Sequence, residues 1–263
     1  MGAVKAAVGD ALITFVWMFC ISGLGFATFL ITAALEIQGA HFSLLVTASL
    51  IFVIVFTFNV IADAMGGASF NPTGNAAFYA AGFGEDTLIS MALRFPAQVA
   101  IDLSFLLVLA DGSIDEFCGF SQAAGAVGGL LALYEVMPPD YKHLLVGPSL
   151  KVDLHTGAIA EGALTFVITT AVLWIIFKGP PSPLVKALMI TICTLGVITA
   201  GDSYTGPSMN PANAYGWAYL NNRHNNWEQF YVYWICPFIG AISAGWLFRV
   251  VFPPRPPVKA KKA

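Results

Sequence analysis

Charged residues are scarce in this chain. Only 10% of its 263 residues are Asp, Glu, Lys or Arg, against about 25% in an ordinary soluble domain. So few charges cannot cover a surface that faces water, whereas a surface that faces lipid needs almost none. With 57% hydrophobic residues, the composition excludes a disordered chain and argues against a soluble globular enzyme.

Several motifs of catalysis and ligand binding are also missing. No basic cluster occurs outside the last few residues and the formal net charge is −3, which argues against nucleic acid as a partner. The four cysteines show no paired spacing, and three of them lie in apolar runs, which favours buried packing residues over disulfides or metal ligands. Phosphate loops, nucleophile elbows and metal-ligand clusters are absent from the sequence, so we expect no enzymatic activity, cofactor or metal.

What the chain has instead is a series of long apolar runs. A membrane-spanning helix needs ~20 mostly apolar residues, and five runs satisfy this: 6–33, 42–62, 155–177, 183–200 and 229–252. Region 88–137 is also apolar but too long for one helix. The first run contains Asp10 and follows a single lysine, Lys5, so we expect a retained span rather than a cleaved signal peptide.

The basic residues indicate how the spans are oriented, because cytosolic loops are enriched in Lys and Arg. If there are six spans and both termini are cytosolic, nine basic residues lie inside: Lys5, Arg94, Lys178, Lys186, Arg249, Arg255, Lys259, Lys261 and Lys262. Three lie outside: Lys142, Lys151 and Arg223. The excess favours cytosolic termini, and we expect residues 253–263 to form a basic cytosolic tail.

Two short segments, Asn71–Gly82 and Asn210–Leu220, each begin with Asn-Pro. Asn is a favoured N-cap and Pro a favoured first helical residue, so both segments should start a helix. Such a helix is ~18 Å long, about half of a bilayer. Each follows a Gly-containing stretch that can turn sharply. We therefore predict two re-entrant half-helices, which persist at membrane depth only when buried in protein or lining a wet cavity.

These features occur twice. An acid followed by Thr-Phe-Val recurs at Asp10 and Glu161, and GASFNP at residues 67–72 is repeated as GPSMNP at residues 206–211. The two halves, 1–137 and 150–252, should hold three spans each, which inverts the second half relative to the first. Inverted repeats with broken helices indicate a site near the bilayer midplane.

The paired motifs GGASFNPT and TGPSMNPA, with an acid in the first span of each half, resemble the aquaporin family. NPT in the first motif, YTGPSMNPA around the second and the KAKKA tail are most similar to the first subgroup of the plant small basic intrinsic proteins. The resemblance implies an all-α membrane protein with six transmembrane helices and two half-helices. It also implies a homotetramer with one water pore per subunit, in the endoplasmic reticulum membrane.

The resemblance places two motifs at the pore centre: Asn71, Pro72 and Thr73, and Asn210, Pro211 and Ala212. The N-terminus of each half-helix is positively polarised, and an Asn carboxamide can cap the helix while it offers N–H donors. Two such ends facing each other should orient water and repel cations, a barrier already described for aquaporin-type pores. Asp10 and Glu161 are implied to hold the re-entrant backbone to the helix core.

The implied outer constriction departs from the water-selective pattern. It consists of Ile51, Ile198, Pro207 and Asn213, where many water channels have Arg at the last position and His at the second. Ser69 and Thr73 also replace the usual His and Ala of the first motif. A ring without fixed cationic donors leaves a pore for another small neutral solute, or a non-conducting member of the fold, as alternatives to a water channel. A secondary transporter would need ionisable groups at the midplane, where this chain has amides.

Region 88–137 should hold one span but contains a polar interruption, ADGSIDEFCG. Removing Val99–Gln122 joins Gln98 to Ala123 and leaves RFPAQAAGAVGGLLAL, a continuous span rich in small residues. The 24 residues removed contain four acids and no base. We therefore predict that 99–122 is an insertion in the third span of a single channel domain, 1–252, with a natural long loop as the alternative.

Overall fold

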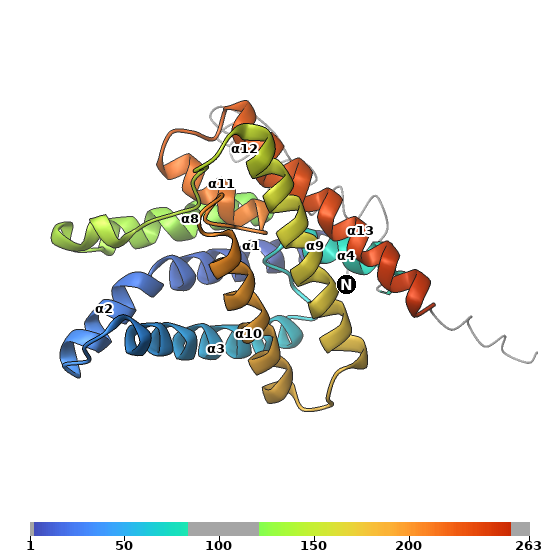
Figure 1. Cartoon of the computed structure of the whole chain (residues 1–263), viewed down its shortest axis with the longest axis horizontal. Coiled ribbons are helices and arrows are strands. Elements are labelled where there is room, and N and C mark those ends of the chain that lie inside the picture. Colours follow the sequence, from blue (N-terminus) through green and yellow to red (C-terminus); the bar gives the residue numbers. More distant parts are fainter. Residues whose placement is uncertain (1–2, 84–120, 254–263) are drawn as a thin grey trace, which may run out of the picture.

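The computed structural model describes residues 3–83 and 121–253, and all regular structure in these two ranges is helical (Figure 1). The elements of the first half are α1 (Ala3–Ser22), α2 (Leu24–Ala34), α3 (Ala40–Ala64), α4 (Pro72–Ala81) and α8 (Ser121–Val136). Those that follow are η2 (Pro139–Leu144), α9 (Leu154–Lys178), α10 (Pro183–Gly201), α11 (Pro211–Leu220), α12 (Trp227–Phe230), η3 (Tyr231–Ile235) and α13 (Cys236–Val251).

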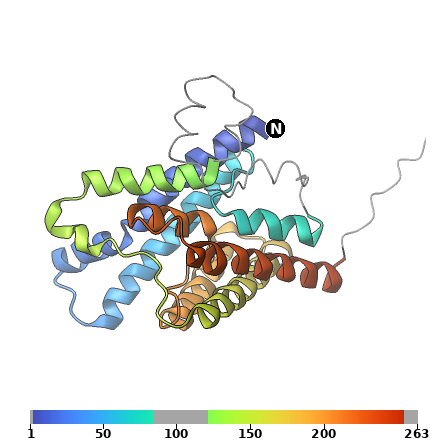
Figure 2. The same cartoon turned by 90° about the horizontal axis from the view of Figure 1, so that it is seen from above.

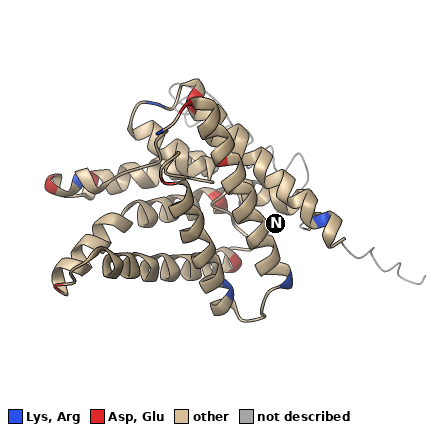
Figure 3. Cartoon of the chain, viewed as in Figure 1, with Lys and Arg blue, Asp and Glu red and all other residues tan. Residues whose placement is uncertain are grey.

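Five described segments are long and apolar enough to cross a membrane: Lys5–Ser22, Ala40–Ala64, Leu154–Lys178, Pro183–Gly201 and Trp227–Val251. They fall on the five predicted runs. Charged residues gather toward helix ends and connecting segments, while most helix middles carry none (Figure 3). The predicted all-α membrane fold is therefore confirmed.

The first predicted span, 6–33, is divided in the structure. The helix breaks at Gly23, which separates α1 from α2. The carbonyl of Gly23 accepts the backbone N–H of Ala27 over 2.9 Å, as the first hydrogen bond of α2. Glycine is a poor helix former, and here it lies against Leu133 of α8. The hydrophobic pattern alone could not distinguish this broken helix from a continuous one.

The two halves pack in equivalent ways. Helix α1 packs against α8 as α9 packs against α13, and α11 packs against α8 as α4 packs against α13. Figure 2 shows α4 lying alongside α13. Helices α3 and α10, the second spans of the two halves, contact each other. This exchange of half-helices between the halves is the arrangement that an inverted repeat predicts.

Two glycines confirm the register of this repeat. A Cβ atom on Gly125 of α8 would lie 2.3 Å from the carbonyl oxygen of Ala11 on α1, and a Cβ on Gly240 of α13 would lie 2.2 Å from that of Gly162 on α9. Ala11 and Gly162 directly follow the two intramembrane acids, Asp10 and Glu161. In both pairs, α1 with α8 and α9 with α13, the backbones of the two helices thus come into contact at the residue that follows the acid.

Some predictions concern residues outside the described ranges. They are the first part of region 88–137, most of the proposed insertion 99–122, and the tail beyond Pro253. The last two residues of the proposed insertion are described, because α8 begins at Ser121 and includes Gln122.

Candidate functional site

Both half-helices begin where their Asn-Pro dipeptides stand. Asn71 has an extended backbone, and its side-chain oxygen accepts the N–H of Thr73 over 3.0 Å, with Pro72 as the first residue of α4. Asn210 has nearly the same backbone angles, and its Oδ1 accepts the N–H groups of Ala212 at 3.1 Å and Asn213 at 3.3 Å. The two asparagines are therefore N-caps of α4 and α11.

The two caps are bonded across to each other's loops. Asn71 Nδ2 donates to the carbonyl oxygen of Met209 over 3.3 Å, and Asn210 Nδ2 donates to that of Phe70 over 2.8 Å. Met209 and Phe70 each directly precede the opposite asparagine. The positively polarised N-termini of α4 and α11 thus meet head to head.

The loop before each cap is shaped in a matching way. Ser69 Oγ donates to the carbonyl of Asn71 over 3.2 Å, and Ser208 Oγ donates to that of Asn210 over 2.8 Å. The halves differ at Met209, which has a φ of +52°, a left-handed backbone that non-glycine residues seldom adopt. This conformation is held from both sides of the residue, because Glu161 accepts its N–H and Asn71 donates to its carbonyl.

The two intramembrane acids accept hydrogen bonds from these loops. Asp10 Oδ1 accepts the N–H of Ser69 over 2.7 Å, and Asp10 Oδ2 accepts Nε2 of Gln122 over 3.0 Å. Glu161 accepts two backbone N–H groups, from Ser208 at 2.8 Å and from Met209 at 3.2 Å. Both acids are fully buried. Each acid therefore has hydrogen-bond donors that offset part of the cost of burying it.

Three of the four predicted constriction residues lie on helices α3, α10 and α11, and the fourth, Pro207, lies in the loop between α10 and α11. Pro207 is buried, and its ring packs so closely on Gly201 that a Cβ there would lie 2.6 Å from Pro207 Cγ. Asn213 is half-buried in the first turn of α11, and its Oδ1 is buried without a hydrogen-bond partner among the described residues. Ile198 is half-buried near the end of α10. Ile51 packs instead with Val55 and Ala187 in an apolar cluster between α3 and α10.

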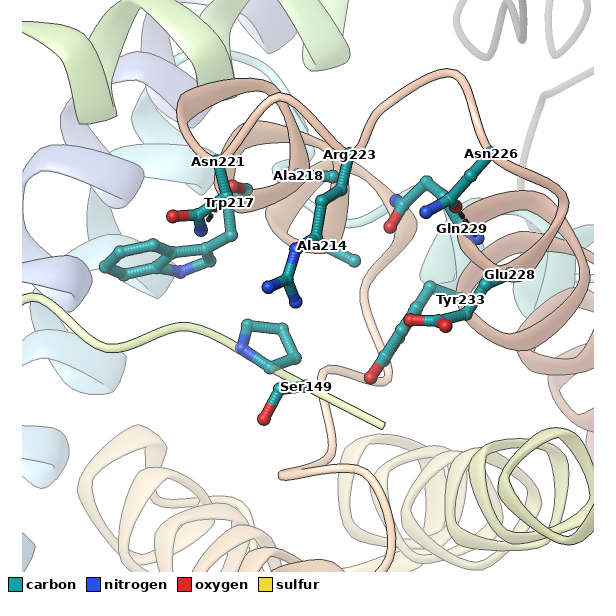
Figure 4. Close-up of a pocket in the computed structure, with 11 residues that line it drawn as sticks. Ser149, Ala214, Trp217, Ala218, Asn221, Arg223, Asn226, Glu228, Gln229 and Tyr233 are labelled. Carbon is teal, nitrogen blue, oxygen red and sulfur yellow. Dashed lines mark hydrogen bonds between the residues drawn. The ribbon is translucent and has the colours of Figure 1, made fainter. Parts of the chain in front are cut away.

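A small polar cavity lies beside α11, along the face that carries Ala214, Trp217 and Ala218 (Figure 4). It holds about 30 Å³, room for a water molecule or two. Its walls come from the loop at Pro148 and Ser149, from the α11 face that carries Trp217, and from the segment between Arg223 and Tyr233. Neither cap asparagine is among the residues that line the cavity.

The loop that closes this cavity is fastened to the second re-entrant segment. Ser149 and Lys151 donate their backbone N–H groups to the carbonyls of Thr205 and Tyr204 over 2.9 and 2.8 Å. Lys151 Nζ also pairs with Asp202 over 3.2 Å. At the start of α9, hydrogen bonds from the Thr156 side chain and backbone lower the pKa of the Asp153 carboxyl. The loop and the segment that carries Pro207 are thus one connected unit.

Sequence reasoning missed three parts of the site. It did not give Gln122 as a donor to Asp10, it did not identify the carbonyls of Met209 and Phe70 as acceptors, and it gave Thr73 no bonding role. The internal repeat could have indicated Gln122. Gln122 and Pro237 occupy equivalent positions in the two halves, so a side chain with a donor stands where the other half has a proline. The carbonyl contacts depend on turn geometry that no residue pattern encodes. Within the described ranges, no three His, Cys, Asp or Glu side chains gather as a metal site.

Comparison with known proteins identifies the family to which this chain is similar. The family model described as major intrinsic protein matches residues 117–248. Aquaporin SIP1-2 of Zea mays is 59% identical over 264 residues, covering 99% of this chain and 98% of the relative. Aquaporin SIP1-1 of Oryza sativa subsp. japonica is 57% identical, covering 100% and 99%, and Aquaporin SIP1-1 of Arabidopsis thaliana is 47% identical, covering 100% and 98%.

The fold is also similar to a solved structure. The X-ray structure of the aquaglyceroporin from Plasmodium falciparum superposes with a TM-score of 0.62 and covers 96% of this chain and 98% of that one, at 19% sequence identity. This likeness concerns the fold, and the full-length relatives establish the family. The chain is a multi-pass integral membrane protein that belongs to the major intrinsic protein family, whose members are membrane channels and not enzymes.

Proposed function

We propose that this protein is a channel for the passive passage of water, with its pore at the junction of the two Asn-Pro half-helices. The observation that carries the proposal is the reciprocal pair of hydrogen bonds, from Asn71 to Met209 and from Asn210 to Phe70. These bonds bring the N-termini of α4 and α11 together, and the acids behind them, Asp10 and Glu161, support the loops.

The junction would act on water through its positive potential. The N-terminal end of each half-helix carries about half a positive charge and backbone N–H groups without intrahelical partners. A water molecule between the two ends turns its oxygen toward them, which interrupts the chain of hydrogen bonds that a proton would follow. The same potential opposes cations, so neutral solutes such as water are favoured over cations.

The second candidate is a pore for another small neutral solute. Asn213 stands where a guanidinium would provide fixed donors, and its neighbour in the proposed ring is the apolar Pro207. With Ile51 and Ile198, this constriction would be largely apolar and selective by size rather than by hydrogen bonding. An ion-coupled transporter is disfavoured, because the groups at the cap junction are amides.

We further propose a homotetramer in the endoplasmic reticulum membrane, with both termini in the cytosol.

Stopped-flow light scattering on proteoliposomes tests the proposal. Purified protein should raise the osmotic water permeability above that of empty vesicles. Parallel measurements of glycerol and urea uptake distinguish a water channel from a pore for another small neutral solute.

Asn210→Asp puts a carboxylate at the positive junction and should lower the water flux. Asn225→Asp, the same change in an exposed loop, is the matched control. Unchanged permeability and proton exclusion in Asn210→Asp would count against a pore at this junction.

A further inference from the structure

We infer that the hydroxyl of Thr73 is a positioning group that fixes the carboxamide of Asn71 at the junction. Thr73 Oγ1 lies 2.7 Å from Asn71 Oδ1 and 3.2 Å from the carbonyl oxygen of Met209. Its side chain is 2% exposed. One hydroxyl therefore contacts both the cap of its own half-helix and the loop of the opposite half. This role rests on the proposed function only for its effect on flux.

The polarity of these contacts sets the orientation of the Asn71 amide. Asn71 Oδ1 faces two donors on Thr73, the backbone N–H at 3.0 Å and the hydroxyl at 2.7 Å. Asn71 Nδ2 faces an acceptor, the Met209 carbonyl. Turning the carboxamide over would point its NH₂ group at the backbone N–H of Thr73 and its oxygen at the Met209 carbonyl. Both contacts would then be repulsive, so the observed orientation is the favoured one.

The second motif shows why the hydroxyl is needed in the first. Asn210 Oδ1 accepts two backbone N–H groups, those of Ala212 and Asn213. The residue equivalent to Asn213 is Gly74, and its N–H donates instead to the main-chain carbonyl of Asn71 over 3.1 Å. Thr73 Oγ1 supplies to Asn71 Oδ1 the kind of second donor that the backbone supplies to Asn210. Ala212, with no hydroxyl, suffices where the backbone provides two.

The test compares three variants of the full-length protein in proteoliposomes. Thr73→Val keeps the shape of the side chain and removes the hydroxyl, whereas Thr73→Ser keeps the hydroxyl and removes the methyl group. Thr165→Val is the matched control, because Thr165 is fully buried and its hydroxyl has no partner among the described residues. Size-exclusion chromatography first establishes that each variant is folded.

We expect Thr73→Val to lower the water permeability by about fivefold, the population change that corresponds to the loss of one ordinary hydrogen bond. Thr73→Ser and Thr165→Val should stay near the unmodified protein. A structure of Thr73→Val should show the Asn71 carboxamide moved away from the Met209 carbonyl. This structural result does not depend on conduction and tests the inference even if the unmodified protein passes no water, an outcome that would refute the proposed function alone.

Two results would overturn the inference. One is a Thr73→Val structure in which Asn71 Nδ2 still donates to Met209 O with the same geometry. The other is an equal loss of flux in Thr73→Ser and Thr73→Val, which would show that the shape of the side chain matters and the hydroxyl does not.

Discussion

Gln122 and Asp10, 112 positions apart in the chain, are joined by a hydrogen bond of 3.0 Å from Nε2 to Oδ2, with both side chains buried. The bond ties the start of α8 to the middle of α1. In the second half Pro237 takes the place of Gln122 and has no donor to offer, while the acid there, Glu161, accepts two backbone N–H groups. The two halves thus hold their re-entrant loops with an equivalent acid and an equivalent serine N–H, and they differ in the second donor.

Replacing Gln122 by Met, which has a similar shape and no donor, should therefore destabilise the protein. A buried carboxylate that loses a donor costs about 1–3 kcal/mol. We expect a lower thermal unfolding midpoint in detergent for Gln122→Met, and no change for Gln38→Met, where the glutamine is exposed. Equal midpoints for the two variants would mean that the contact contributes nothing to stability.

Close backbone contact between spans gives a second prediction. Gly125→Ala and Gly240→Ala each force a methyl group against a carbonyl of the neighbouring helix, and overpacking of this kind costs roughly 1–3 kcal/mol. Gly196→Ala on α10 is the control, because nothing lies within 4 Å of the added Cβ. The first two variants should unfold at lower temperature than the unmodified protein, and Gly196→Ala at the same or a higher temperature. A similar loss in all three would argue against the repeat register.

The sequence predicts the half-helices well because their starts depend on local chemistry. Asn-Pro provides a cap and a first residue, and the helices α4 and α11 begin at Pro72 and Pro211 as expected. The acids and the six-span order followed from the internal repeat. These features need only spacing and residue type.

Three-dimensional detail was beyond the sequence for physical reasons. The contact between Asn71 and Met209 depends on a left-handed backbone at Met209, which nothing in that residue's chemistry predicts. The break at Gly23 and the π-helical turn Tyr231–Ile235 interrupt runs whose hydropathy is continuous. The resemblance places Ile51 in the constriction as the facing position of the second span, but it does not give the cluster in which Ile51 packs, which includes Val55 and Ala187.

The proposed constriction can be tested by restoring a guanidinium. Asn213→Arg should narrow the mouth and lower the passage of glycerol and urea relative to water, and a barrier higher by about 1.4 kcal/mol slows passage tenfold. Asn225→Arg adds the same charge in an exposed loop and should leave the ratio unchanged. Solute uptake through Asn213→Arg that equals or exceeds that of the unmodified protein would show that Asn213 does not face the pore.

The proposed insertion gives the last prediction, which depends on the bond between Gln122 and Asp10. Gln122, which donates to Asp10 over 3.0 Å, is the last residue of the proposed insertion. Deleting Val99–Gln122 places Gln98 directly before Ala123, where it can donate to Asp10 as Gln122 does. It also brings Arg94–Gln98 next to α8 and makes the formal net charge +1.

We expect this deletion to raise the yield of folded protein and its water permeability. The 24 residues carry four acids, and acids inside a membrane are costly. Interrupting a span in lipid is also costly, because each unsatisfied backbone group costs several kcal/mol. Size-exclusion profiles and flux of the two forms, measured side by side, decide the question. Adding Gln98→Met to the deletion should remove much of the gain, because the donor to Asp10 is lost again. If the full-length chain is equally stable and equally conductive, residues 99–122 are a genuine part of the fold.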